Sequence, residues 1–207
     1  MRGDFSGKLI ILDRDGTLNE HRPDYVKSPQ DWVPLPGALE AVARLNHAGW
    51  STVIATNQAG LGRGLFDMAS FNAIHWHINQ LLSKVGARIE AVFLCPHVDE
   101  DRCACRKPKP GLYHDIAQRF NLDLQSVPAV GESLRDLLAI QAAGCQPHLV
   151  LTGECQRLGY RHVEHIKAQV PRMKVHQNLS DFADFIIRTE RRAEGLGAAD
   201  SGPGGLN

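Results

Sequence analysis

The sequence has no excess of charge of either sign. Lys and Arg together number 23, and Asp and Glu together also number 23, so the formal net charge is zero. Proteins that bind nucleic acids through bulk electrostatics carry a clear positive excess. We therefore expect no nucleic-acid partner for this chain.

Long apolar runs are also missing. A membrane-spanning helix needs about 20 consecutive apolar residues, and no stretch of this sequence approaches that length. The first residues also lack the apolar segment of a secretory signal. These two absences predict a cytoplasmic protein with no membrane partner.

The sequence does contain enough apolar material for one core. Hydrophobic residues make up 43% of the 207 residues and charged residues 22%, which is the usual balance of a soluble domain. A chain of this length suits one domain. We predict a single, monomeric domain over residues 1–190. Residues 191–207 are rich in Gly, Ala and Ser, which predicts a disordered tail.

Short apolar runs alternate with helical patterns along the chain. Strands are expected at residues 9–12, 52–55, 91–94, 127–130 and 148–151, with an edge strand at 173–176. Helices are expected from Gly37 to a cap at Gly49, from Asp67 to Leu82, at residues 111–120 and 134–143, and at residues 181–188 after a cap at Ser180. This alternation predicts an α/β fold: a doubly wound, Rossmann-like parallel sheet with helices on both faces. No insert is long enough to form a large cap domain.

Two carboxylates leave the first expected strand. Asp13 and Asp15 directly follow the apolar residues 9–12 and precede Gly16. Doubly wound sheets bind their ligands at the carboxyl ends of the strands. One carboxylate can attack as a nucleophile while the other moves a proton, and the two can share a cation. The alternative is a solvated turn, which an isolated Asp-Gly pair would indicate.

Polar residues also follow two later strands. Thr56, Asn57 and Gln58 could hold phosphate oxygens, although such residues also end strands merely to satisfy backbone groups. Glu132 follows the strand at 127–130, and Asp136 lies about one helical turn further on. Carboxylates there could complete a Mg²⁺ site, because Mg²⁺ binds a few carboxylates together with water and phosphate oxygens.

Three of the five cysteines crowd into residues 95–105. Cys95, Cys103 and Cys105 form with His97 a Cys₃His set, which suits tetrahedral Zn²⁺. Four filled positions predict a structural site rather than a catalytic one. Incidental thiols are the alternative, but the Pro-rich, charged surroundings offer no apolar core to bury them. We expect zinc to fold this loop and to present the basic segment 106–111 to a substrate.

These elements, in this order, resemble the haloacid dehalogenase superfamily of aspartyl phosphotransferases over about residues 8 to 152. The resemblance implies that Asp13 is the nucleophile that takes the phosphoryl group. It implies that Asp15 is the general acid for the leaving hydroxyl and then the base for the hydrolytic water. Thr56 and Lys107 would stabilise the transferring phosphoryl group. An Asp at the acid/base position implies hydrolysis of a phosphate monoester.

The zinc loop narrows the resemblance to heptose-bisphosphate phosphatases and histidinol-phosphate phosphatases, which share it. The run from Thr56 to Phe66, with its Arg-Gly-x-Phe ending, and the Asp24-Tyr25-Val26 segment are similar to the heptose group. The implied activity is removal of the 7-phosphate of the small sugar bisphosphate D-glycero-D-manno-heptose 1,7-bisphosphate, a step toward nucleotide-activated heptose for bacterial surface polysaccharides. The implied substrate contacts are Asp24, Tyr25, Thr56, Asn57, Gln58, Ala59, Arg63, Arg106 and Lys107.

One position departs from that family. Its members usually have Gly-Asp where this chain has Gly131-Glu132, and Ser133 replaces the lysine of some relatives. The implied Mg²⁺ ligands are Asp13, Asp15 and Glu132, with Asp136 acting through water or as a brace behind them. The extra methylene of Glu132 is expected to weaken Mg²⁺ binding relative to an aspartate.

Two other functions stay open at this point. One is the same chemistry on histidinol phosphate or another small phosphomonoester. The other is a zinc-stabilised binding module whose phosphatase site has decayed, for which the departure at Glu132 is the motive.

Overall fold

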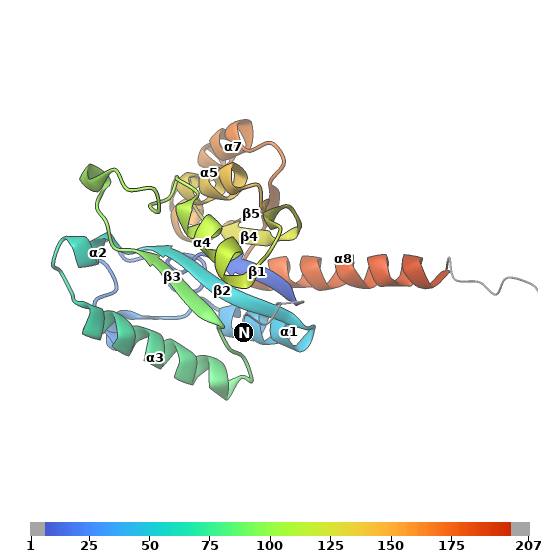
Figure 1. The fold of residues 1–207 in the computed structure, drawn as a ribbon, viewed down its shortest axis with the longest axis horizontal. Coiled ribbons are helices and arrows are strands. Elements are labelled where there is room, and N and C mark those ends of the chain that lie inside the picture. The colour runs from blue at the N-terminus through green and yellow to red at the C-terminus, as the bar shows by residue number, and fades with distance from the viewer. Residues whose placement is uncertain (1–6, 200–207) are drawn as a thin grey trace, which may run out of the picture.

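A single parallel sheet organises the chain, whose computed structural model describes residues 7–199. The strands lie in the order β3-β2-β1-β4-β5-β6, and each pairs in parallel with its neighbours (Figure 1). They are β1 (Lys8–Leu12), β2 (Trp50–Asn57), β3 (Ala91–Cys95), β4 (Pro128–Gly131), β5 (Gln146–Val150) and β6 (Lys174–His176). The expected doubly wound α/β fold is confirmed.

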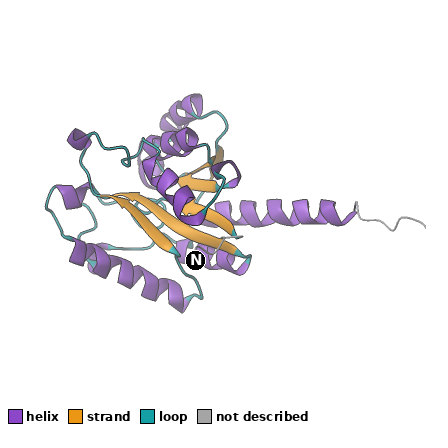
Figure 2. Cartoon of the chain, in the orientation of Figure 1, coloured by secondary structure: helices purple, strands orange, loops and turns teal. Residues whose placement is uncertain are grey.

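Helices follow the strands in alternation (Figure 2). The α-helices are α1 (Ala38–His47), α2 (Ala59–Gly62), α3 (Met68–Lys84), α4 (Gly111–Phe120), α5 (Leu134–Ala143), α6 (Gly153–Leu158), α7 (Tyr160–Gln169) and α8 (Leu179–Ala199). Short 3₁₀ turns lie at η1 (Pro29–Asp31), η2 (Asp99–Asp101) and η3 (Leu124–Ser126). Local signals set several ends: the Asp67 carboxylate caps α3 by accepting from the Ser70 N–H at 2.8 Å, and Gly144 ends α5 at φ 83°.

The sheet is buried on both faces because its strand residues alternate between two cores. Ile10 and Leu12 pack with α1, α3 and the first half of α8. Leu9 and Ile11 pack on the opposite face with α4, α5 and α7. This alternation explains why the first strand is a continuous apolar run rather than an alternating one.

The strand order also fixes where a ligand can bind. From β1 the chain builds the sheet outward through β2 and β3, then returns to place β4 on the other side of β1. The connections therefore diverge at the carboxyl ends of β1 and β4, which is the position where doubly wound sheets form a crevice. Within residues 7–199 no separate cap domain is inserted over this crevice.

The last helix differs from expectation. Ser180 was expected to cap a helix at 181–188, but α8 begins at Leu179 and continues to Ala199. The Asn178 side chain caps it instead, since its Oδ1 accepts from the Asp181 N–H at 3.0 Å. Residues 191–199 of the expected tail are thus helical, because the Glu, Arg and Ala residues that follow position 189 favour helix. The rest of that tail, 200–207, lies outside the described residues.

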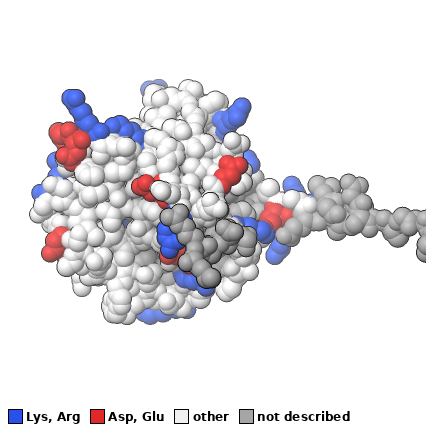
Figure 3. All heavy atoms as spheres, in the orientation of Figure 1, with Lys and Arg blue, Asp and Glu red and all other residues white. Residues whose placement is uncertain are grey.

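Part of α8 projects beyond the body of the molecule (Figure 1). Its first half is tied to α1 and β2: Arg44 pairs with Asp184 and donates to the Ser180 Oγ at 2.8 Å, and the Trp50 Nε1–H donates to Glu190 at 2.8 Å. None of the helices within residues 7–199 has the length and apolarity that a bilayer crossing requires. On the face shown in Figure 3, basic and acidic side chains lie in small, interspersed groups.

Candidate active site and metal centre

A cavity of about 220 Å³ opens at the carboxyl ends of β1, β2 and β4. It brings together most of the residues that the sequence singled out. Those that line it are Asp13, Asp15, Tyr25, Thr56, Asn57, Gln58, Ala59, Arg106, Lys107, Glu132 and Asp136.

Two expected substrate contacts do not line the cavity. The Asp24 carboxylate is 56% exposed and faces Arg22 and Lys27, at 3.3 and 3.6 Å. Arg63 is the C-terminal cap of the short helix α2. Four lining residues were missed by the sequence analysis: His21, Arg22, Pro23 and Arg135. Of these, Arg135 could have been predicted from the sequence. It lies three residues after Glu132, a spacing that can bring two side chains to the same side of a turn of helix.

Asp13 and Lys107 form the centre of the site. The Lys107 Nζ lies 2.7 Å from Asp13 Oδ1, and both side chains are buried. Burial raises the pKa of Asp13 to about 7, the negative charge of Asp136 adds to this, and Lys107 opposes both. The Asp13 carboxylate therefore depends on positive charge beside it to remain ionised at neutral pH.

Lys107 is shared between two carboxylates. Its Nζ also lies 2.6 Å from Asp136 Oδ1. Although burial by itself would lower the pKa of Lys107, the charges of Asp13 and Asp136 raise it above its usual value. Lys107 is therefore a permanent cation directly beside Asp13, where it can neutralise the oxygens of a bound anion.

Asp15 is held by a set of donors. Its carboxylate accepts from the Arg14 Nε and Nη2 at 3.0 and 2.8 Å, from Asn19 Nδ2 at 3.0 Å and from Gln58 Nε2 at 2.8 Å. Burial opposes ionisation, but the Arg14 charge and these hydrogen bonds lower the pKa of Asp15 below its ordinary value. Arg14 is itself fully buried and lies over the Phe71 ring at 5.9 Å. The carboxylate is thus fixed in orientation and held in its ionised form.

Glu132 follows β4 and fits between two backbone segments. Its Oε2 accepts from the Glu154 N–H. A Cβ at Gly16 would lie 2.8 Å from the Glu132 Cγ, and a Cβ at Gly153 would lie 2.5 Å from its Oε2. Both glycines have positive φ, 82° and 53°, so the space for the longer side chain is provided by residues without a Cβ.

The acidic set suits a hard divalent cation. Burial, together with the charges of Asp136 and Asp13, raises the pKa of Glu132 to about 9. Asp13 and Glu132 are thus two buried carboxylates that resist ionisation side by side until a cation neutralises them. Oxygen donors of this kind are what Mg²⁺ prefers, so the residues present fit that ion.

Asp136 has a different environment. Its Oδ2 accepts from the Ser133 N–H at 3.1 Å and from the Ser133 Oγ at 2.5 Å, and its Oδ1 faces Lys107. Burial would raise its pKa, but the Lys107 charge lowers it. Both oxygens are therefore engaged with the protein, which suits a bracing carboxylate.

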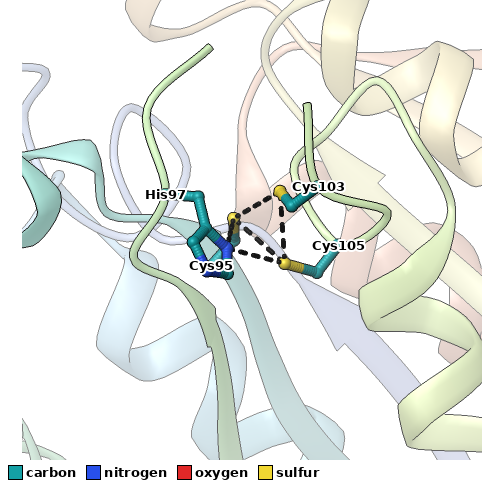
Figure 4. A group of neighbouring side chains, drawn as sticks. All are labelled: Cys95, His97, Cys103 and Cys105. Carbon is teal, nitrogen blue, oxygen red and sulfur yellow. Dashed lines mark hydrogen bonds between the residues drawn. The ribbon is translucent and has the colours of Figure 1, made fainter. Parts of the chain in front are cut away.

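A second cluster lies beyond the end of β3 (Figure 4). The Sγ atoms of Cys95, Cys103 and Cys105 and the Nδ1 of His97 lie within 4.8 Å of one another. Their adjacent pairs are separated by 3.2 to 3.6 Å. A tetrahedron with bonds of about 2.0–2.3 Å to a central ion has edges of about 3.3–3.8 Å. The four donors therefore fit a tetrahedral metal ion, and their thiol and imidazole chemistry suits zinc.

The cluster lies behind residues that line the cavity. The Gln58 N–H donates to the Cys95 carbonyl at 2.7 Å, and Gln58 in turn donates to Asp15. Arg106 directly follows the ligand Cys105 and donates to the His97 carbonyl at 3.3 Å and to Asp99 Oδ1 at 2.5 Å. The cluster is thus linked to the cavity through Gln58 and Arg106, which both line it.

The fold, with an aspartate beside a buried lysine at the strand ends, is typical of a class of hydrolases. The sequence profile of the haloacid dehalogenase-like hydrolases matches residues 22–144. The chain belongs to this family.

Relatives within the family are more specific. A D-glycero-beta-D-manno-heptose-1,7-bisphosphate 7-phosphatase of Bordetella bronchiseptica is 58% identical over 70% of this chain and 82% of its own length. The enzyme of that name from Neisseria meningitidis serogroup A is 42% identical over 87% and 95%. A crystal structure of the D,D-heptose 1,7-bisphosphate phosphatase from B. bronchiseptica, complexed with magnesium and phosphate, matches with a TM-score of 0.83 and 48% identity, covering 88% of this chain and 99% of that one.

Proposed function

We propose that the chain is a Mg²⁺-dependent phosphatase that removes the 7-phosphate of D-glycero-D-manno-heptose 1,7-bisphosphate. The observation that carries the proposal is the buried pairing of Asp13 with Lys107 at 2.7 Å inside a strand-end cavity. The substrate follows from the relatives, since a heptose bisphosphate phosphatase is 58% identical to this chain over 146 residues.

In the first half of the reaction, an oxygen of Asp13 attacks the phosphorus and the P–O bond to the sugar breaks. The sugar oxygen leaves with a proton supplied by Asp15. In the free enzyme Asp15 is held ionised by Arg14, and the arrival of a phosphate dianion beside it raises its proton affinity. Lys107 neutralises equatorial phosphate oxygens during the transfer. Thr56 is fixed by the Gln58 Nε2, which donates to its Oγ1 at 2.9 Å.

In the second half, Asp15 takes a proton from water, whose oxygen attacks the phosphorus of the aspartyl-phosphate and releases inorganic phosphate and Asp13. A Mg²⁺ ion held by Asp13, Asp15 and Glu132, with Asp136 as their brace, would supply positive charge for the same oxygens.

In the second cluster, we propose Zn²⁺ on Cys95, His97, Cys103 and Cys105 as a structural ion that fixes the loop carrying Arg106 and Lys107.

The test is a hydrolysis screen with the full chain and Mg²⁺. Phosphate release is measured from both anomers of the heptose 1,7-bisphosphate, from histidinol phosphate and from a simple aryl phosphate. We expect kcat/KM for one heptose bisphosphate anomer to exceed that for histidinol phosphate by at least about 10²-fold, because a polar site rejects a ligand that leaves its charged groups unpaired. A preference for histidinol phosphate would reject the substrate, and no hydrolysis of any ester would support a decayed binding module.

A further inference from the structure

Four cations line the catalytic cavity, and three of them have close partners. Lys107 lies between Asp13 and Asp136. Arg22 faces Asp24 at 3.3 Å and Asp31 at 3.8 Å, and Arg106 donates to Asp99 at 2.5 Å. These cations are neutralised within the protein before any substrate arrives.

Arg135 is the exception among these lining residues. Its nearest charged partner is Glu154, whose Oε2 lies 3.7 Å from the Arg135 Nη2, beyond hydrogen-bond distance. Its side chain is 47% exposed, yet it lines the same cavity as Asp13. A guanidinium at the mouth of an anion-binding cavity, held by no close hydrogen bond, is available to a ligand.

Arg106 lines the same cavity as Arg135. The Arg106 Nε donates to Asp99 Oδ1 at 2.5 Å. Asp99 belongs to the exposed turn η2, and its side chain is 78% exposed. A solvent-facing carboxylate therefore holds the Arg106 guanidinium, which lines the cavity.

We propose that Arg135, which lines the cavity together with Arg106, binds the phosphate that the enzyme does not cleave, and that it thereby selects sugar bisphosphates over monophosphates. This inference rests on the proposed function. The scissile phosphate is accounted for by Lys107 and the acidic cluster, so a substrate with a second phosphate needs a second cation. Arginine suits this task because its planar fork binds two phosphate oxygens at once. Asp99 is then the resident counter-ion that the second phosphate replaces.

The experiment compares two substrates that differ only in that phosphate, the heptose 1,7-bisphosphate and the heptose 7-phosphate. In Arg135→Gln, we expect kcat/KM for the bisphosphate to fall about 10- to 100-fold, the range for losing charge-assisted hydrogen bonds, mainly through KM. The value for the 7-phosphate should change by less than about threefold. Arg135→Lys should recover part of the loss, since it restores charge without the fork. Arg161→Gln, on the exposed side of α7 and outside the cavity lining, is the matched control.

A second variant gives an effect of the opposite sign. Asp99→Asn removes the competing carboxylate, so KM for the bisphosphate should decrease while KM for the 7-phosphate stays unchanged. Equal losses of kcat/KM on both substrates in Arg135→Gln would mean that Arg135 acts only through α5 and Asp136. No loss on either substrate would mean that Arg135 does not contact the second phosphate. Either result overturns the inference. If the unaltered chain hydrolyses the bisphosphate no better than the 7-phosphate, the proposed function fails first and the inference falls with it.

Discussion

Asn57 and Lys107 hold each other by two hydrogen bonds. The Asn57 Nδ2 donates to the Lys107 carbonyl at 3.0 Å, and the Lys107 N–H donates to the Asn57 Oδ1 at 3.1 Å. Asn57 ends β2, whereas Lys107 follows the metal loop, so this pair fixes the lysine relative to the sheet. Asn57 lines the cavity, but both ends of its amide are committed to the protein backbone.

We therefore expect Asn57→Ala to lower kcat by about 10- to 100-fold, because small displacements of a group that must neutralise the phosphoryl oxygens are costly. KM should change less, and the melting temperature should fall only slightly. Asn57→Asp keeps the acceptor for the Lys107 N–H and should retain part of the activity. Asn72→Ala, at an exposed position on α3, is the control. An unaltered kcat in Asn57→Ala would show that Lys107 needs no such support.

The metal loop supports a second prediction. Elemental analysis should find one Zn²⁺ per chain, and Cys103→Ser or Cys105→Ser should lose it. The melting temperature and the activity should fall together, since structural zinc contributes directly to folding and Lys107 lies only two residues beyond Cys105. Cys145→Ala, at a buried thiol outside the cluster, should keep the full zinc content. Metal-free protein with normal melting and full turnover would contradict this role.

The separate roles of the two strand-end aspartates give a third prediction. Asp13→Asn should abolish turnover, because an amide is a poor nucleophile. Asp15→Asn should still bind substrate but lose protonation of the leaving group, at a cost of about 10²–10⁴ in kcat. Acid quenching of the native enzyme during turnover should trap phosphate on Asp13, as peptide mapping can verify. Near-normal turnover in Asp13→Asn would rule out an aspartyl-phosphate.

Much of the candidate active site was predictable from the sequence. Parallel strands place the residues at their carboxyl ends along the same edge of the sheet. Asp13, Thr56 and Glu132 follow buried apolar runs, and the structure places all three at the cavity. Helices with strong apolar faces were found as well, whereas α7, with Ile166 as its single fully buried residue, was missed. α2 was missed because four residues are too few for a periodic pattern.

Side-chain partners were harder to anticipate. Nothing in the sequence around Asn57 indicates that its amide binds the backbone of a residue 50 positions away. The Arg14 pairing with Asp15 depends on the conformation of the strand-end turn, which residue types alone do not specify. The space for Glu132 is provided by Gly153, beyond the end of β5. Contacts of this kind follow from the assembled fold rather than from local pattern.

A buried histidine pair gives a prediction for pH. His148 Nδ1 and His176 Nε2 lie 2.9 Å apart between the sheet and α8, with Phe182 against both rings. Burial, aided by the charge of His176, lowers the pKa of His148 to about 3. Burial also lowers the pKa of His176, an effect that Asp181 opposes and Lys174 reinforces.

Both histidines therefore bind a proton less readily in the folded state than in the unfolded chain, where they titrate near pH 6.5 (about the value in model peptides). Below that pH the unfolded state binds more protons, so the free energy of unfolding should fall as pH decreases, by at most about 1.4 kcal/mol per pH unit for each histidine. Above about pH 7 the pair adds no pH dependence. Denaturant titrations between about pH 5 and pH 8 should show a flatter profile for His148→Gln but not for His114→Gln, an exposed control. Identical profiles would mean that other groups control acid stability.

The last prediction tests which of two carboxylates, Glu132 or Asp136, binds Mg²⁺. Asp136 has one oxygen engaged by Lys107 and the other by Ser133. Glu132 uses Oε2 for the Glu154 N–H and reaches the cavity through the space left by two glycines. Burial and the charges of Asp136 and Asp13 raise its pKa, and a bound divalent cation would favour its ionised form.

We therefore expect Glu132→Gln, which keeps the shape and removes the charge, to raise the Mg²⁺ concentration for half-maximal rate at least about tenfold, as losing a charged ligand implies. Calorimetric titration of Mg²⁺ without substrate should show the same weakening. Asp136→Asn should instead lower kcat, because Lys107 loses one of its two carboxylates, while its Mg²⁺ curve moves little. Glu164→Gln, exposed on α7, should leave both quantities unchanged. If Glu132→Gln leaves the Mg²⁺ curve in place and Asp136→Asn shifts it, Asp136 is the ligand and Glu132 only braces the Glu154 backbone.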